Sequence, residues 1–207
     1  MIPRLTHQIW LGGPLPDHLA EYRRTVVDHH PGWEHRLWGD DDFGWLQNQS
    51  LFDRADELAP GSEGQFRSDV ARYEILRLMG GVYLDLDIEV RAPLDGFLGV
   101  ECFAGWETDR FANNAVIGAT RWHPLYVDLV DRLPASIEAN AGKRPNRMTG
   151  PHFFTPLAVE HGCTIHPRET FYPYAYDELE RADEEFPGAM TVHHWDNQRK
   201  LKSVPRG

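Results

Sequence analysis

One segment of the chain alternates apolar and acidic side chains, and it limits what the surrounding sequence can build. Residues 82–90 read Val-Tyr-Leu-Asp-Leu-Asp-Ile-Glu-Val and follow two glycines. Side chains on a β-strand point to opposite faces in turn, so this pattern predicts a strand with one apolar and one acidic face. The carboxylates of Asp85, Asp87 and Glu89 would repel one another there without a counter-charge. Because a divalent cation binds several oxygens at once, the strand is expected to border a metal site, which in turn suggests a phosphate-bearing substrate.

The remaining sequence alternates between strand-like and helix-like segments. Strands are expected over residues 4–11, 33–38, 101–106, 114–119, 163–166 and 190–195, and helices over residues 17–28, 63–79, 123–140 and 151–162. Pro134 is expected to interrupt the third of these helices. The alternation predicts an α/β fold with a parallel sheet covered by helices on both faces. Ligands of such sheets bind beyond the carboxyl ends of the strands.

The charge balance excludes some classes of partner. The 207 residues include 21 basic and 32 acidic side chains, a net charge of −11. Proteins that bind nucleic acid or anionic lipid usually carry the opposite sign, so a phosphorylated ligand would have to be held locally, by a metal or a few arginines. The sequence has neither a recognisable signal peptide nor an apolar segment long enough to cross a bilayer. It is therefore expected to be cytoplasmic with no transmembrane segment, and peripheral contact with a membrane stays open.

Two pairs of charged residues are the strongest candidates for chemistry. Asp85 and Asp87 would stand about 6.6 Å apart on an ideal strand, so that one could bind a metal while the other holds a sugar hydroxyl or a metal-bound water. The alternative is a strand end with solvated carboxylates. On the preceding helix, Asp69 and Arg72 share one face, where Arg72 could meet a diphosphate and Asp69 could orient it or contact a ribose. The alternative for this pair is a surface ion pair.

Aromatic, imidazole and amide side chains supply further candidates. Trp10 follows the first strand and could stack a nucleobase or belong to the core. His193 and His194 could bind a transition metal such as manganese or be structural. The pair Asn113-Asn114 could bind sugar hydroxyls or form a turn.

Taken together, these segments form an ordered series along nearly the whole chain. They are Ile2-Pro3, His7-Gln8-Ile9-Trp10, Pro31-Gly32-Trp33, Leu37-Trp38, Ser68-Asp69, Arg72-Tyr73-Glu74-Ile75-Leu76, Gly80 through Asp87, Asn114 through Ala119, His123-Pro124, Thr149-Gly150-Pro151 and His193-His194-Trp195. The series resembles glycosyltransferase family 32, which is described by a sugar-binding region containing a DXD motif. That family includes fungal-type mannosyltransferases and is related to glucosylating cytotoxins.

The resemblance implies a GT-A type, Rossmann-like nucleotide-sugar-binding fold with a mostly parallel sheet. It implies one domain over residues 1–207, with residues 1–125 binding the nucleotide sugar and residues 126–207 forming the acceptor side and a closing segment. It also implies a retaining glycosyltransferase that uses a UDP- or GDP-sugar donor and Mn²⁺ or Mg²⁺. Its acceptor would be a saccharide, a glycolipid or another hydroxyl compound.

The resemblance also assigns roles to single residues. Trp10 would stack the base and Asn114 would contact the sugar. Asp85 would contact ribose and sugar, Asp87 would bind the metal, and Asp69 and Arg72 would hold donor sugar and phosphate. His193 or His194 would complete the metal shell or close over the diphosphate. Catalysis would rest on Asp85, Asp87 and Arg72.

One departure from the family pattern and two rival functions complete these expectations. A Ser-Trp pair often follows the His-His-Trp segment in the family, whereas residues 196–200 read Asp-Asn-Gln-Arg-Lys, of which Arg199 or Lys200 could neutralise the diphosphate instead. A catalytically silent nucleotide-sugar-binding module is one alternative. A haloacid-dehalogenase-like phosphatase is the other, because Leu84 to Asp87 resembles its nucleophile strand. The acceptor is expected to meet the variable loops 133–148 and 171–185.

Overall fold

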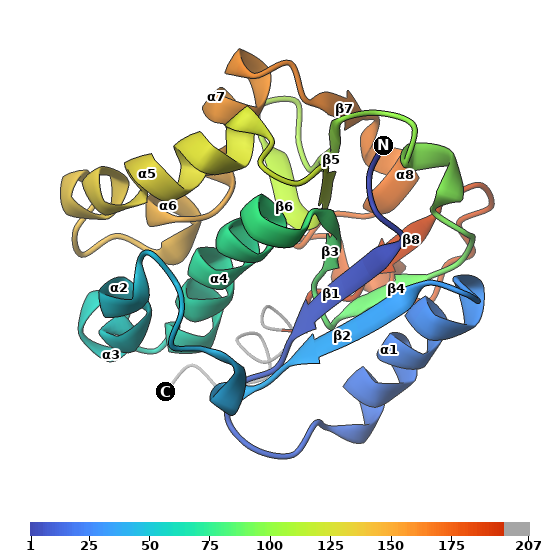
Figure 1. The fold of residues 1–207 in the computed structure, drawn as a ribbon. Coiled ribbons are helices and arrows are strands. Elements are labelled where there is room, and N and C mark those ends of the chain that lie inside the picture. The colour runs from blue at the N-terminus through green and yellow to red at the C-terminus, as the bar shows by residue number, and fades with distance from the viewer. Residues whose placement is uncertain (197–207) are drawn as a thin grey trace, which may run out of the picture.

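The computed structural model describes residues 1–196, and its centre is a six-stranded sheet in the order β2-β1-β3-β6-β5-β7 (Figure 1). The strands of this sheet are β1 (Leu5–Ile9), β2 (Glu34–Trp38), β3 (Gly81–Leu84), β5 (Cys102–Trp106), β6 (Ala112–Ala119) and β7 (Thr164–His166). A separate two-stranded sheet pairs β4 (Ile88–Val90) with β8 (Thr191–His193) in antiparallel fashion. Arg199 and Lys200 lie outside the described residues.

The helices are α1 (Asp17–His29), α2 (Gln49–Asp53), α3 (Ala55–Leu58), α4 (Glu63–Met79), α5 (Pro124–Ala139), α6 (Pro145–Met148), α7 (Pro151–Glu160) and α8 (Arg168–Phe171), with short 3₁₀ turns at Asp40–Asp42, Asp95–Phe97 and Leu179–Arg181. None of the helices in residues 1–196 combines the length and the apolar character needed to cross a bilayer.

Five strands of the central sheet run in the same direction and β6 runs in the opposite one. The pairs β1–β2, β1–β3 and β5–β7 are parallel, whereas β6 is antiparallel to both β3 and β5. The expected mostly parallel α/β sheet is therefore confirmed. The carboxyl ends of β1, β3 and β5 meet the amino end of β6 at one edge, where ligands of such sheets bind.

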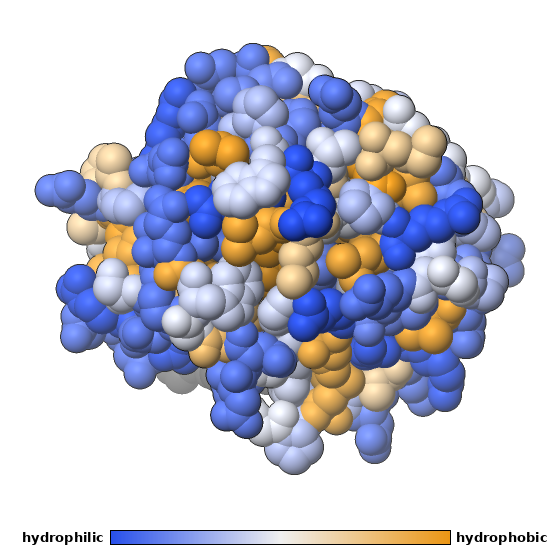
Figure 2. Space-filling view, in the orientation of Figure 1, coloured by the Kyte–Doolittle hydropathy of each residue, from blue (hydrophilic) through white to orange (hydrophobic). Residues whose placement is uncertain are grey.

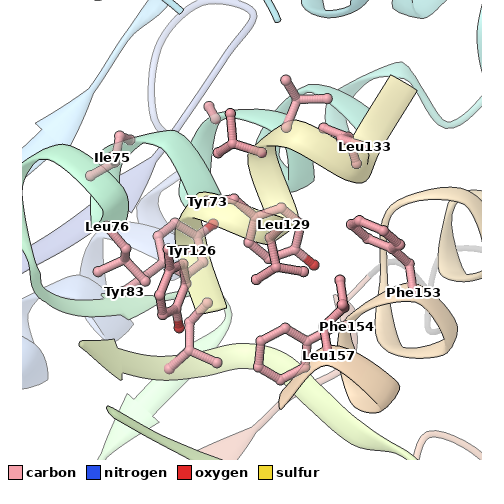
Figure 3. Close-up of a cluster of buried hydrophobic side chains, with 14 of the residues drawn as sticks. Tyr73, Ile75, Leu76, Tyr83, Tyr126, Leu129, Leu133, Phe153, Phe154 and Leu157 are labelled. Atoms are coloured by element: carbon pink, nitrogen blue, oxygen red, sulfur yellow. The ribbon is translucent and has the colours of Figure 1, made fainter. Parts of the chain in front are cut away.

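Apolar side chains cover both faces of the sheet. On one face α4, α5 and α7 pack a cluster that includes Tyr73, Tyr126 and Phe154 against Tyr83 of β3 (Figure 3). On the other face Val82 and Leu84 join Val26 of α1 and the β4 residues Ile88 and Val90. This division follows the alternation in the sequence, which places neighbouring strand residues on opposite faces. On the outer surface in Figure 2, polar residues surround separate apolar patches.

The acidic segment is not one continuous strand, so that expectation was wrong. Strand β3 ends at Leu84, residues 85–87 form a turn in which the Ile88 N–H donates to the Asp85 carbonyl at 3.1 Å, and β4 then pairs with β8 instead of continuing in the central sheet. The turn parts Glu89 from Asp85 and Asp87, whose carboxylates keep one oxygen each within 4.8 Å of the other. It leaves Asp85 and Asp87 at the sheet edge, while Glu89 binds His194 and Arg91.

Helix α5 passes through Pro134, although an interruption was expected there. Proline has no N–H to donate to the carbonyl four residues earlier, that of Val130. The Asn48 side chain replaces this donor, because its Nδ2 donates to the Val130 carbonyl oxygen at 2.9 Å. The Asn48 backbone N–H in turn donates to buried Glu74. The contact with Asn48 therefore removes the free-energy cost of the unpaired Val130 carbonyl, which the local sequence predicts.

Because Asn48 replaces the missing donor, the effects of mutating Asn48 and Pro134 on stability should depend on each other. Asn48→Ala should destabilise the protein by ~1–2 kcal/mol, since a buried carbonyl loses its partner. In a Pro134→Ala background the restored backbone N–H can reach the Val130 carbonyl, so the same Asn48→Ala change should cost distinctly less. Urea unfolding of the wild type, both single variants and the double variant measures the coupling. Strictly additive costs would contradict this account of the helix.

A buried histidine on β1 makes stability depend on pH. The His7 Nδ1 accepts a hydrogen bond from Trp38 and its Nε2 donates to the Gly80 carbonyl, so the neutral ring suits both partners. Burial lowers the pKa of His7 from 6.5 to about 4, against the smaller opposing effect of the Gly80 bond. Because the unfolded chain binds this proton more readily, the His7 contribution is complete above pH 6.5 and is lost as pH falls towards 4.

The expected size of this effect is about 3 kcal/mol over the whole interval. Urea unfolding at pH 7.5, 5.5 and 4.5 should show stability falling with pH in the wild type. The His7→Gln variant, which keeps a side-chain donor near Gly80, should show a shallower fall. Parallel curves for the two proteins would refute the assignment.

Candidate active site

A cavity of about 600 Å³ opens at the carboxyl edge of the sheet. Seven of the candidate residues from the sequence line it, whereas Glu89 and His194 do not: the seven are Trp10, Asp69, Arg72, Asp85, Asp87, Asn114 and His193. They come from the ends of β1 and β8, the turn after β3, the start of β6 and the middle of α4. The fold therefore gathers into one cavity side chains that are up to 183 residues apart in the sequence.

Arg72 is the buried centre of this site. Its NH2 group lies 3.2 Å from an Asp69 carboxylate oxygen and 3.1 Å from one of Asp85, and its NH1 group donates to the Asn114 carbonyl at 2.7 Å. The Arg72 side chain is 3% exposed, and its guanidinium lies over the Tyr83 ring. The surface ion pair considered for Asp69 and Arg72 is therefore excluded, because both side chains are inside the protein.

Asp69 is held by neutral donors as well as by Arg72. The Asn114 Nδ2 donates to Asp69 Oδ1 at 2.9 Å, and the Thr149 hydroxyl donates to Asp69 Oδ2 at 2.7 Å. Burial raises the pKa of Asp69, and the neighbouring Arg72 charge opposes this rise. With both oxygens engaged, Asp69 is suited to fixing Arg72 and Asn114 in place. The possible turn at Asn113-Asn114 is excluded, because both residues lie within β6.

Asp85, Asp87 and His193 form a group that could hold a metal ion, with one ligand atom from each within 4.8 Å of the others. The pairing of β4 with β8 sets His193 opposite Ile88, next to Asp87. The His193 Nε2 lies 3.2 Å from Asp87 Oδ1, and its Nδ1 is buried without a hydrogen-bond partner among the described residues. Two carboxylates and an imidazole are a donor set that suits Mn²⁺, so the residues present fit such an ion.

His194 does not belong to this group. Its Nε2 lies 2.9 Å from Glu89 Oε2, and its ring stacks on Tyr22 of α1 with centroids 4.2 Å apart. His193 is the last residue of β8, and His194 follows it with its side chain directed to Glu89 and Tyr22 and away from the cavity. Of the two histidines expected near the metal, only His193 therefore lies in the group with Asp85 and Asp87, whereas His194 contacts Glu89 and Tyr22.

The two aspartates of the turn differ in their electrostatic surroundings. Burial raises the pKa of Asp85, with Arg72 opposing the rise. Burial would also raise the pKa of Asp87. This effect is outweighed by the charge and hydrogen bond of His193 and by the hydrogen bond that the Asp196 N–H donates, so the pKa of Asp87 is lowered to about 2. Asp87 is therefore ionised at neutral pH, as a metal ligand must be.

Trp10 lies at the other end of the site from the β5–β6 hairpin. Its backbone N–H donates to the Trp38 carbonyl, and its indole N–H donates to the Gly13 carbonyl at 2.9 Å. The side chain is partly exposed and lines the cavity, so Trp10 is not a simple core residue. The hydrogen bond to Gly13 fixes the indole ring and leaves its apolar surface available for a flat ligand.

The cavity also includes residues that the sequence did not identify as candidates. Glu107, Thr108 and Phe111 come from the hairpin between β5 and β6, and His152 comes from the start of α7. Of the loops expected to meet an acceptor, only Arg144, Asn146 and Tyr176 line the cavity. No short motif marks Glu107, because only the pairing of β5 with β6 brings it to the site.

Comparison with known proteins agrees with this geometry. Residues 16–104 match the family model described as a glycosyltransferase sugar-binding region containing a DXD motif. The matched region contains Asp69, Arg72 and the turn with Asp85 and Asp87.

A curated relative shares part of its length with this chain. Inositol phosphoceramide mannosyltransferase 3 of Schizosaccharomyces pombe is 30% identical over 141 residues, which are 64% of this chain. The match spans only 37% of that relative's length.

Solved structures extend the likeness to most of the chain. The PaToxG glycosyltransferase has a TM-score of 0.64 at 16% identity, covering 77% of this chain and 69% of the other. The galactosyltransferase LgtC, solved with donor and acceptor sugar analogues, has a TM-score of 0.52 at 11% identity, covering 98% of both chains. At such identities the likeness concerns the fold, and it shows that this chain has a GT-A-like glycosyltransferase fold.

Proposed function

We propose that this chain is a glycosyltransferase that transfers a sugar from a nucleotide-diphosphate sugar to a hydroxyl acceptor, because its residues 16–104 match the family model of a glycosyltransferase sugar-binding region containing a DXD motif. The donor is a UDP- or GDP-hexose, and the reaction depends on Mn²⁺ or Mg²⁺. The configuration at the anomeric carbon is retained. A saccharide or glycolipid is the proposed acceptor, in keeping with the glycolipid named for the Schizosaccharomyces pombe relative.

One observation carries this proposal: a candidate divalent-metal group and a buried arginine lie side by side at the edge of a cavity. Asp85 connects them, because it belongs to the group and also binds Arg72 at 3.1 Å. A divalent ion bound there would, together with Arg72, supply the positive charge that a diphosphate needs in an otherwise acidic protein. Asp87, Asp85 and His193 would hold the metal, and a bound metal would neutralise charge on the diphosphate.

Each residue of the site then has its own role in the reaction. Trp10 stacks the base, Arg72 binds the diphosphate, and Asn114 and Asp85 orient the transferred sugar. In the reaction the bond from the anomeric carbon to the phosphate oxygen breaks, and the bond to the acceptor oxygen forms on the same face of the sugar. The acceptor proton passes to the leaving phosphate oxygen. Arg72 stabilises the charge that develops on this leaving group.

The proposal is tested by release of free nucleotide from a panel of UDP- and GDP-hexoses with Mn²⁺, Mg²⁺ or EDTA. We expect at least one donor to release nucleotide only when a divalent ion is present. The anomeric configuration of the product, read by proton NMR with an acceptor added, tests retention. If no donor is cleaved and none binds, the proposed function is wrong.

The two rival functions predict different results in the same assay. A silent nucleotide-sugar-binding module would show a thermal shift with a donor but would release no nucleotide. A haloacid-dehalogenase-like phosphatase would form a phospho-enzyme at its nucleophilic aspartate, which acid trapping detects. The GT-A-like fold leaves the phosphatase without support.

A further inference from the structure

The sheet arranges the site in a linear order. Along the carboxyl edge the strands follow the order β1, β3, β6 and β5 (Figure 1). Trp10, Asp85, Asn114 and Glu107 belong to these strands or follow them directly, so they have the same order. Neighbouring strands are ~4.8 Å apart, so β5 lies about 14 Å from β1. With the base at Trp10 and the sugar at Asn114, the wall formed by the β5–β6 hairpin lies beyond the donor.

The acidic side chain on this wall is Glu107. It lines the cavity, and its Oε2 accepts a hydrogen bond from Asn113 Nδ2 at 2.8 Å. Among residues 1–196 no Lys, Arg or His nitrogen forms an ion pair with it. Burial raises the pKa of Glu107, with His193 and Asn113 opposing this effect. A partly desolvated carboxylate costs free energy, so an oxygen left open to a cavity points to a ligand that donates hydrogen bonds.

The hairpin holds Glu107 in a fixed position. The Glu107 and Thr108 N–H groups both donate to the Phe111 carbonyl, and the Thr108 hydroxyl accepts from the N–H groups of Arg110 and Phe111. Asn113 is fixed as well, since its Oδ1 accepts from the Ala115 N–H at 2.7 Å. The carboxylate therefore needs little reorganisation to bind a ligand.

An aromatic pair lies beside this carboxylate. Phe111 of the hairpin and His152 of α7 both line the cavity, and their rings lie 4.0 Å apart between centroids with planes 33° apart. Apolar ring surface next to a hydrogen-bond acceptor matches a cyclic polyol, which has both C–H faces and hydroxyl groups. The donor sugar already has Asp69, Asn114 and Asp85 near it, so this second polar wall is available for another molecule.

We propose that Glu107 and Asn113, with Phe111 and His152, form the acceptor subsite and bind a cyclic polyol, a sugar or an inositol, through its hydroxyl groups. This inference rests on the proposed function and adds the residues that select the acceptor. Glu107 accepts a hydrogen bond from the acceptor, and the aromatic pair contacts the face of its ring. The acceptor hydroxyl is thereby directed towards the anomeric carbon held at Asn114.

The test compares donor hydrolysis with transfer in the variant Glu107→Gln, which keeps an oxygen for Asn113 and removes the charge. The donor is one that the wild type hydrolyses with Mn²⁺, and the acceptor probes are methyl hexosides, myo-inositol and glycerophosphoinositol, with phosphatidylinositol vesicles as a separate arm. Transfer to the vesicles alone would identify a lipid headgroup as the source of the polyol. Glu101→Gln is the matched control, since Glu101 is exposed and precedes the opposite end of β5.

We expect Glu107→Gln to raise the KM for the acceptor about tenfold or more, the effect of losing a hydrogen bond to a charged group. Donor hydrolysis without acceptor should stay within about twofold of the wild type in both variants. A parallel loss of hydrolysis would assign Glu107 to the donor sugar and overturn the proposal, as would unchanged transfer. Wild-type hydrolysis with no transfer to any probe would also overturn it, whereas absence of hydrolysis would overturn the proposed function itself.

Discussion

Asp87→Asn should reduce metal-dependent nucleotide release by ~10²–10³-fold while leaving the fold intact. Asp87 contributes the most acidic carboxylate of the metal group, and its amide counterpart would bind a divalent ion poorly. The side chain is partly exposed at the turn, so its replacement opens no cavity in the core. Nucleotide release is measured across a Mn²⁺ titration, and Mn²⁺ affinity is measured by calorimetry.

The matched control for this variant is Asp41→Asn. Asp41 lies in the exposed 3₁₀ turn Asp40–Asp42, away from the cavity, so its loss should change neither Mn²⁺ affinity nor turnover. Circular dichroism of both variants should match the wild type. Full activity of Asp87→Asn at low Mn²⁺ concentration would contradict the assignment of the metal group.

Arg72→Met should produce the largest loss of stability, about 3–5 kcal/mol. The methionine roughly fills the space of the aliphatic chain, but Asp69 and the inner oxygen of Asp85 lose their cation inside the protein. The Asn114 carbonyl also loses its donor. Urea unfolding measures the loss, and nucleotide release at a temperature where the variant is folded should be almost abolished.

Two further variants distinguish the effect of burial on stability from the effect of charge. Arg54–Glu57 is an ion pair with the same three-residue spacing on an exposed helix end, and Arg54→Met should cost less than about 0.5 kcal/mol. Arg72→Lys keeps the charge but cannot make the forked contacts to Asp69 and Asp85, so it should be intermediate in stability and remain poorly active. A loss for Arg72→Met as small as that for Arg54→Met would show that the buried network contributes little.

Much of the fold could be predicted from the sequence, because local patterns carried the information. The helix over residues 63–79 was predicted with the bounds that the structure has, since helical spacing begins after a turn and stops at two glycines. The expected mostly parallel sheet is confirmed as well. The course of the acidic segment was not predictable in the same way. Whether β4 continues the central sheet or leaves it depends on β8, about a hundred residues later.

For the site, the sequence predicted which types of residue are present but not which residues they contact. The spacing of Asp85 and Asp87, and that of Asp69 and Arg72, indicated metal and phosphate chemistry from the chain alone. Neither spacing could reveal that Arg72 is buried between two carboxylates, because Asp85 reaches it from a different element.

What the order of amino acids established is the set of elements and the chemical character of the candidate side chains, since both depend on neighbours within a few residues. Packing between distant segments decided three further features. It determined that His193 and not His194 lies next to Asp87, that α5 continues through Pro134, and that Glu107 lies on the cavity wall. Strand pairing selects which face of β8 meets Asp87, and Asn48 supplies the missing donor to α5. Contacts of this kind have no signature in local sequence, because their energy appears only when the chain is folded.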